Sequence, residues 1–135
     1  MNFIDRKKLK VLLVDNDLWV RKILKATIDE CIPNAIIFHA EDGKQAIIAC
    51  QEEKPDIVFI DRNISEKLIK EISIEIRSSE SSDNIPIILV YGEANSIKPE
   101  WNFGKSIDEF VLKPLSLETM KSILEKWVHI KLIGV

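Results

Sequence analysis

Hydrophobic residues gather into five short runs, separated by longer segments in which apolar positions recur every three or four residues. Short apolar runs rich in β-branched and aromatic residues are typical of strands buried on both faces of a parallel sheet. The third run, Ile57 to Ile60, ends in a single carboxylate, Asp61, where the polarity changes abruptly. The predicted strands are residues 11–14, 35–38, 57–60, 86–90 and 109–112.

The segments between the runs have the periodicity of amphipathic helices. Asp17 and Ser116 precede two of them and can cap these helices, because their side chains can accept hydrogen bonds from the free amides of a first turn. We expect Ile23 in the first helix and Leu117 in the last to face the core. The predicted helices are residues 18–30, 44–53, 66–78 and 99–103, and a last one from residue 117 to at least 127.

This alternation of strands and helices predicts an α/β fold: a three-layer, doubly wound, parallel five-stranded sheet joined by right-handed crossovers. In the flavodoxin-like strand order 2-1-3-4-5, the topological switch point lies between strands one and three. Asp15 and Asp61 end these two strands, so we expect them to converge. Tyr91 and Lys113 follow strands four and five. At 135 residues the chain is predicted to be a single domain, residues 1–135.

Composition excludes several classes of protein. The net charge of −3 gives no broad positive field for nucleic acid or an anionic membrane. No stretch has the length of a membrane span, and the amino terminus lacks the features of a secretory signal. Cys31 and Cys50 have no metal-ligand spacing, so we expect free thiols in a reducing compartment. These observations predict a cytoplasmic protein without direct nucleic-acid or membrane contact.

The chemistry of the strand ends favours phosphoryl transfer. Two neighbouring carboxylates repel each other unless a cation neutralises them. Lys113 can supply one positive charge, and a hard cation such as Mg²⁺ can supply the rest. A site with a metal and a lysine suits an aspartate that accepts a phosphoryl group. The four glycines are scattered, so the glycine-rich loop of a nucleotide-binding enzyme is absent.

At these positions the chain resembles the receiver domain of two-component response regulators, in the manner of chemotaxis regulators. The resemblance covers a core of about residues 9–127 and depends on the order and spacing of a few strand-end residues. They are Val14-Asp15, Asp61, Phe110 and Lys113-Pro114.

The resemblance implies a role for each matching residue. Asp61 would be the phosphorylated residue and also a metal ligand. Asp15 and Asn16 would be further ligands of Mg²⁺, and Asn63 would offer its backbone carbonyl. Lys113 would bind the phosphoryl group, and its peptide bond to Pro114 would be cis, as is common in the family.

The chain departs from the family pattern at two important positions. Asn16 stands where the family has a second carboxylate, so we expect Mg²⁺ to bind more weakly. Tyr91 replaces the small hydroxyl residue that moves on activation, and Phe110 occupies the position of the switch aromatic. Arg21 matches a position that is often basic in the family, and its simplest interpretation is a solvated helix charge.

The resemblance implies a signalling protein rather than an enzyme. A histidine kinase or phosphotransfer protein would phosphorylate Asp61, and a downstream protein would recognise the switched surface. Homodimers could form through the fourth helix, fifth strand and last helix, where Trp101 is either a core aromatic or an interface anchor. The chain could be a stand-alone receiver or part of a larger regulator or hybrid kinase.

Two alternatives remain open from sequence. Asn16 and Tyr91 also fit a pseudo-receiver, a protein-binding module that acts without phosphorylation. A small metal-dependent phosphatase or a flavodoxin-like cofactor binder would share the fold. The sequence disfavours this second alternative, because Asn63 stands where a phosphatase needs an acidic residue.

Overall fold

The computed structural model describes residues 8–61, 66–78, 85–92 and 107–133, with side chains described as far as residue 128. Its strands form one parallel five-stranded sheet in the order β2-β1-β3-β4-β5. The predicted fold class and strand order are therefore confirmed. The strands are β1 (Lys10–Val14), β2 (Ile36–Ala40), β3 (Ile57–Asp61), β4 (Ile87–Tyr91) and β5 (Glu109–Leu112).

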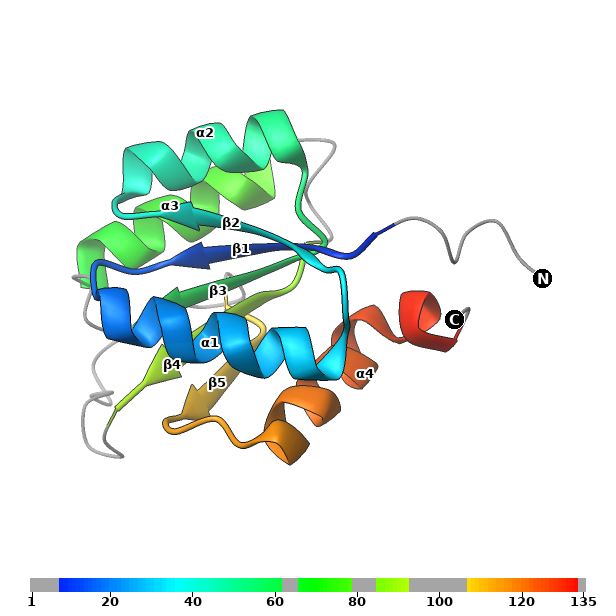
Figure 1. Cartoon of the computed structure of the whole chain (residues 1–135). Helices are drawn as coiled ribbons and strands as arrows, with labels where there is room; N and C mark the ends of the chain where they lie inside the picture. Colours follow the sequence, from blue (N-terminus) through cyan, green and yellow to red (C-terminus); the bar gives the residue numbers. More distant parts are fainter. Residues whose placement is uncertain (1–7, 62–65, 79–84, 93–106, 134–135) are drawn as a thin grey trace.

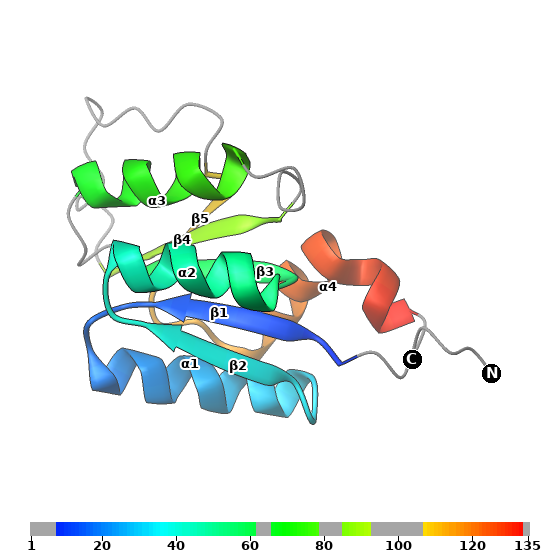
Figure 2. The ribbon, with the colours of Figure 1, turned by 90° about the horizontal axis from the view of Figure 1, so that it is seen from above.

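Helices cover both faces of this sheet. The helices of the described part are α1 (Leu18–Cys31), α2 (Gly43–Glu53), α3 (Glu66–Ser78) and α4 (Leu117–Ile133). α1 and α4 lie on one face, and α2 and α3 lie on the other (Figures 1 and 2). The predicted helix 99–103 and Trp101 fall outside the described residues. No helix that the structure describes is both long and apolar enough to cross a membrane.

Alternate side chains of the central strands enter two separate cores, as the period of a strand requires. Phe59 of β3 packs with Leu24 of α1 and Leu124 of α4 on one face. Ile60 packs with Ala46 of α2 and Ile72 of α3 on the other face. All residues of β3 are buried, Asp61 included. The prediction that this run lies buried on both faces is confirmed.

The ends of the helices follow from local polar residues. Asp17 caps α1, where its carboxylate accepts a hydrogen bond of 2.9 Å from the amide of Trp19. Ser116 precedes α4, and its hydroxyl oxygen accepts one of 3.1 Å from the amide of Thr119. Both predicted caps are confirmed. Asp42 caps α2 in the same way, a cap that was not predicted.

Three predictions about individual elements are wrong. Ile23 is 53% exposed and Leu117 is 37% exposed, although both were expected to face the core. Both residues have the helical spacing of core positions, but the buried stripe of each helix is narrower than its apolar stripe. β2 is only partly buried, because it is an edge strand with a neighbour on one side only, and it runs over Ile36–Ala40 instead of residues 35–38.

The two cysteines differ in accessibility, and both are free, as predicted. Burial raises the pKa of Cys50 to about 12. Burial also raises the pKa of the half-buried Cys31, where Lys121 opposes the shift. Since only the thiolate reacts quickly with an alkylating agent, iodoacetamide at pH 8 is expected to label Cys31 slowly and Cys50 only after denaturation. Peptide mass mapping of native and denatured samples measures both sites, and fast native labelling of Cys50 would contradict its burial.

Candidate functional site

Three of the predicted site residues meet at the carboxyl ends of the central strands. Asp15 follows β1, Asp61 ends β3, and Lys113 follows β5. β1 and β3 are aligned so that Val14 lies beside Ile60, which brings the next residues, Asp15 and Asp61, to the same edge. Side chains alternate between the two faces of a sheet, so Asp15 and Asp61 are both on the face that α1 and α4 cover.

Lys113 and Asp61 form a direct ion pair. The Lys113 ammonium donates a hydrogen bond of 2.9 Å to Oδ1 of Asp61. The Asp61 side chain is 1% exposed, whereas that of Lys113 is 23% exposed. The backbone of Lys113 is fixed by a 2.7 Å hydrogen bond from its amide to the carbonyl oxygen of Tyr91. The peptide bond from Lys113 to Pro114 is cis, as the resemblance implied.

Asp15 is a buried carboxylate with incomplete hydrogen bonding. Its side chain is 1% exposed, and Oδ1 accepts a hydrogen bond of 3.1 Å from the amide of Asp17. Oδ2 is buried and has no hydrogen-bond partner among the described residues. Burial raises the pKa of Asp15, and the nearby charges of Asp61 and Asp17 add to this effect. The hydrogen bond from Asp17 and the positive charge of Arg21 act in the opposite direction.

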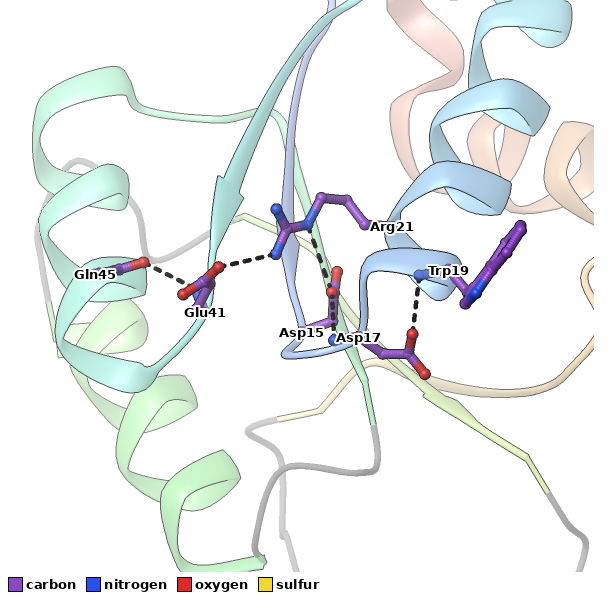
Figure 3. Close-up of polar contacts among 6 residues, drawn as sticks. All are labelled: Asp15, Asp17, Trp19, Arg21, Glu41 and Gln45. Atoms are coloured by element: carbon purple, nitrogen blue, oxygen red, sulfur yellow. Dashed lines mark hydrogen bonds and ion pairs between the residues drawn. The ribbon is translucent and has the colours of Figure 1, made fainter.

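Arg21 is not the solvated helix charge that the sequence suggested. Its side chain is 19% exposed, and its Nε lies 3.7 Å from Oδ1 of Asp15. On its other side, Nη2 of Arg21 lies 3.4 Å from Oε1 of Glu41, which follows β2 (Figure 3). The backbone amide of Glu41 donates a 2.9 Å hydrogen bond to Oε1 of Gln45 in α2. Arg21 therefore links the Asp15 site to the loop between β2 and α2.

The residues present fit a site for Mg²⁺. This ion is commonly held by one or two carboxylates while it keeps several waters. Asp15 and Asp61 provide two carboxylates, and the unpartnered Oδ2 of Asp15 is an available donor. Asn16 is exposed beside them, and Asn63 lies outside the described residues. Within the described residues, no group of three or more His, Cys, Asp and Glu could hold a metal ion. Two carboxylates with waters would suit a hard cation that stays largely hydrated.

The two switch positions, the atypical Tyr91 and the aromatic Phe110, lie on the other face of the sheet. Tyr91 is half-buried at the end of β4, and Phe110 of β5 is exposed. Phe110 lies beside Leu89 and Tyr91 lies beside Leu112 in the strand register. Aligned residues of parallel strands point the same way, so Tyr91 and Phe110 share the face that α2 and α3 cover. They do not belong to the Asp15, Asp61 and Lys113 cluster.

The fold and the site define an α/β protein of the flavodoxin-like class with an acidic site at its topological switch point. Residues 11–125 match the family model described as the response regulator receiver domain. The match covers most of the chain. The chain therefore belongs to this family and is a receiver domain of two-component signalling.

Curated relatives are consistent with this family. The chain is 28% identical over 126 residues to the probable C4-dicarboxylate response regulator DctR of Bacillus subtilis, an alignment covering 93% of this chain and 55% of that protein. It is 25% identical over 118 residues to the chemotaxis protein CheY of Listeria monocytogenes, covering 87% of this chain and 97% of that protein. The chain thus spans about half of the first relative and nearly all of the second.

A solved structure has the same fold. It is the receiver domain of the sensor histidine kinase PA1611 from Pseudomonas aeruginosa, which has a magnesium ion coordinated in its active-site cleft. The TM-score is 0.76 at 20% sequence identity, and the alignment covers 91% of this chain and 99% of that one. At this identity the likeness concerns the fold alone.

Proposed function

We propose that the chain is a single receiver domain, residues 1–135, that accepts a phosphoryl group on Asp61 from a histidine kinase or phosphotransfer protein. The observation that carries the proposal is the 2.9 Å hydrogen bond from the Lys113 ammonium to the buried Asp61 carboxylate. Asp15 follows the neighbouring strand at the same edge of the sheet. An acceptor carboxylate with a cation beside it suits phosphoryl transfer, because the cation can stabilise the charge on the phosphoryl oxygens.

In the proposed step, an oxygen of the Asp61 carboxylate attacks the phosphorus of the donor. A phosphorus–oxygen bond forms, and the phosphorus–nitrogen bond to the donor histidine breaks, with its electron pair remaining on the imidazole. Lys113 stabilises the negative charge on the phosphoryl oxygens, since its ammonium is already directed at the acceptor. Asp15, Asn16, Asp61 and the carbonyl of Asn63 would hold Mg²⁺, which supplies further positive charge when bound. The product is an acyl phosphate on Asp61.

The phosphorylated domain would then favour a different surface conformation, which a downstream protein recognises. A homodimer through β5, α4 and the segment before β5 is one form that such a switch could take. We propose a cytoplasmic setting, with no direct contact with nucleic acid or membrane. Because Tyr91 and Phe110 share one face of the sheet, they are the residues proposed to carry the switch.

One observation favours a second candidate, the pseudo-receiver. The described part of the site has two carboxylates and no third, because Asn16 stands where the family has its second acidic ligand. A protein-binding module that works without phosphorylation would tolerate this loss. The two candidates differ in one measurable property, the formation of a phosphoryl adduct.

The experiment incubates the protein with Mg²⁺ and a small phosphodonor such as acetyl phosphate and then measures its intact mass. The proposed function predicts an adduct of one phosphoryl group that is missing in Asp61→Asn. A pseudo-receiver would give no adduct in either protein.

The weak Mg²⁺ site gives a separate prediction. Asn16→Asp restores a second acidic ligand beside Asp15, and it is expected to tighten Mg²⁺ binding by about tenfold, a change of about 1.4 kcal/mol. Isothermal titration calorimetry measures this affinity. Asn34→Asp adds the same charge in the turn before β2, at the amino ends of the strands and so away from the site. It is expected to leave the Mg²⁺ affinity unchanged. Equal affinity for Asn16→Asp and the unmodified protein would remove Asn16 from the metal site.

A further inference from the structure

Arg21 and Asp15 form a charge pair that is close but not hydrogen-bonded. The separation of 3.7 Å between Arg21 Nε and Asp15 Oδ1 exceeds hydrogen-bond distance. Arg21 Nε and Asp15 Oδ2 are the two buried side-chain polar atoms of the described residues that lack any hydrogen-bond partner. Both unpartnered atoms thus belong to the same pair. Charge attraction holds these two groups near each other, but no hydrogen bond locks them together.

The other half of the guanidinium is occupied by Glu41. Nη2 of Arg21 is 3.4 Å from Oε1 of Glu41, a side chain that is mostly exposed. The position of Glu41 is in turn set by Gln45, which accepts a hydrogen bond from its backbone amide (Figure 3). Arg21 is therefore shared between a buried carboxylate at the proposed metal site and an exposed carboxylate on the neighbouring loop.

We infer that Arg21 is a positioning residue: it acts as the counter-ion of Asp15 in the metal-free protein and thereby opposes cation binding. Glu41 draws the guanidinium away from Asp15 and so weakens this opposition to cation binding. The part of this inference that concerns Mg²⁺ binding rests on the proposed function. Arg21 would lower the charge penalty of the buried Asp15 when no cation is present. A cation that binds Oδ2 of Asp15 must then compete with the guanidinium, so Arg21 and Glu41 together would set the metal affinity.

The two residues are expected to change the affinity in opposite directions. Arg21→Gln removes a positive charge close to the site and is expected to tighten Mg²⁺ binding by about three- to tenfold. Glu41→Gln releases the guanidinium toward Asp15 and is expected to weaken Mg²⁺ binding by about two- to threefold, a small effect because Glu41 is exposed. A purely structural role of this network would weaken binding in both variants. Calorimetric titration with MgCl₂ at fixed ionic strength measures both constants.

A double variant tests whether Glu41 changes the Mg²⁺ affinity through Arg21 or only through its own charge. If Glu41 acts through Arg21, Glu41→Gln has no effect on Mg²⁺ affinity in the Arg21→Gln background. Lys25→Gln is the matched control, because Lys25 is a cation one turn further along α1 that pairs with Asp29 at 2.9 Å. This control is expected to keep the affinity of the unmodified protein. An unchanged or weaker Mg²⁺ affinity in Arg21→Gln would overturn the inference that Arg21 opposes cation binding.

The ion pair itself is tested without metal. In EDTA, the free energy of unfolding is measured for Arg21→Gln, Asp15→Asn and the double variant. A favourable coupling between the two replacements supports the pair, and additive effects would overturn it. If the unmodified protein fails to bind Mg²⁺, the proposed metal site fails, and this cycle still decides whether Arg21 is the counter-ion of Asp15.

Discussion

Replacing Lys113 by methionine is expected to slow the phosphorylation of Asp61 by small phosphodonors by about 10²-fold or more. The lysine ammonium contacts Oδ1 of Asp61 at 2.9 Å in a largely buried position. A fixed cation in such a place is already oriented toward the charge that develops on the phosphoryl group. Methionine keeps much of the length of the side chain but removes the charge. The initial rate of adduct formation, followed by intact mass at saturating Mg²⁺, measures the effect.

Two further variants test whether the slower phosphorylation depends on the position and the chemistry of the lost charge. Lys121→Met removes an exposed lysine of α4 and is expected to leave the rate unchanged. Lys113→Arg keeps the positive charge but replaces a compact ammonium by a planar guanidinium, so an intermediate rate is expected. If Lys113→Met reacted within twofold of the unmodified protein, Lys113 would have no role in binding the phosphoryl group.

Replacing Asp15 by asparagine is expected to stabilise the metal-free protein by about 1–3 kcal/mol at pH 7. Asparagine has nearly the same shape but removes a buried charge whose Oδ2 has no hydrogen-bond partner in the described part of the chain. The same replacement is expected to abolish stabilisation by Mg²⁺, which otherwise rises with metal concentration as ligand binding requires. Chemical unfolding in EDTA and in MgCl₂ measures both effects.

The pH dependence of Asp15 has a definite sign. Its pKa is raised above the ordinary value of 3.8, so the folded state binds this proton more tightly than the unfolded state. The stability that Asp15 contributes is therefore fully present below pH 3.8, and it is lost as the pH rises through the raised pKa. Asp15→Asn is expected to lack this loss.

A control variant identifies the buried site as the cause. Asp29→Asn changes an exposed carboxylate of α1, and it is expected to alter stability by less than about 0.5 kcal/mol and to keep the Mg²⁺ response. A destabilised Asp15→Asn variant in EDTA would show that Arg21 and the Asp17 amide more than compensate the cost of burying the Asp15 charge without metal. The prediction that the Asp15 charge is a net cost to the metal-free protein would then be wrong.

The hydrophobic pattern predicted the strands and helices of the described residues. The run Ile57–Ile60 has no polar position, so it predicts a strand with helices on both faces, and β3 is such a strand. The strand order follows from general rules of α/β topology rather than from any single residue. Ile23 and Leu117 were misplaced for a physical reason: helical spacing shows which residues share a face, but it does not show how much of that face the sheet covers.

The site was only partly predictable. Asp15 and Lys113 come directly after strands and Asp61 ends one, and parallel strands bring their carboxyl ends to the same edge. Arg21 was interpreted as solvated, and Glu41 was overlooked. Their pairing joins α1 to the residue after β2, and such a long-range polar contact leaves no periodic signal in the sequence. Acidic Asp15 with basic Arg21 six residues later, at the start of a helix, was the only local sign.

The most direct test of the central claim is the intact mass of the protein after incubation with Mg²⁺ and acetyl phosphate, with Asp61→Asn and Asp56→Asn in parallel. Asp56 is the matched control, because it lies just before the opposite end of β3, where it accepts a hydrogen bond of 2.8 Å from the Lys10 amide. We predict one phosphoryl group on the unmodified protein and on Asp56→Asn, and none on Asp61→Asn. An adduct that persists in Asp61→Asn, or no adduct on any of the three proteins, would contradict the assignment of Asp61 as the phosphoacceptor.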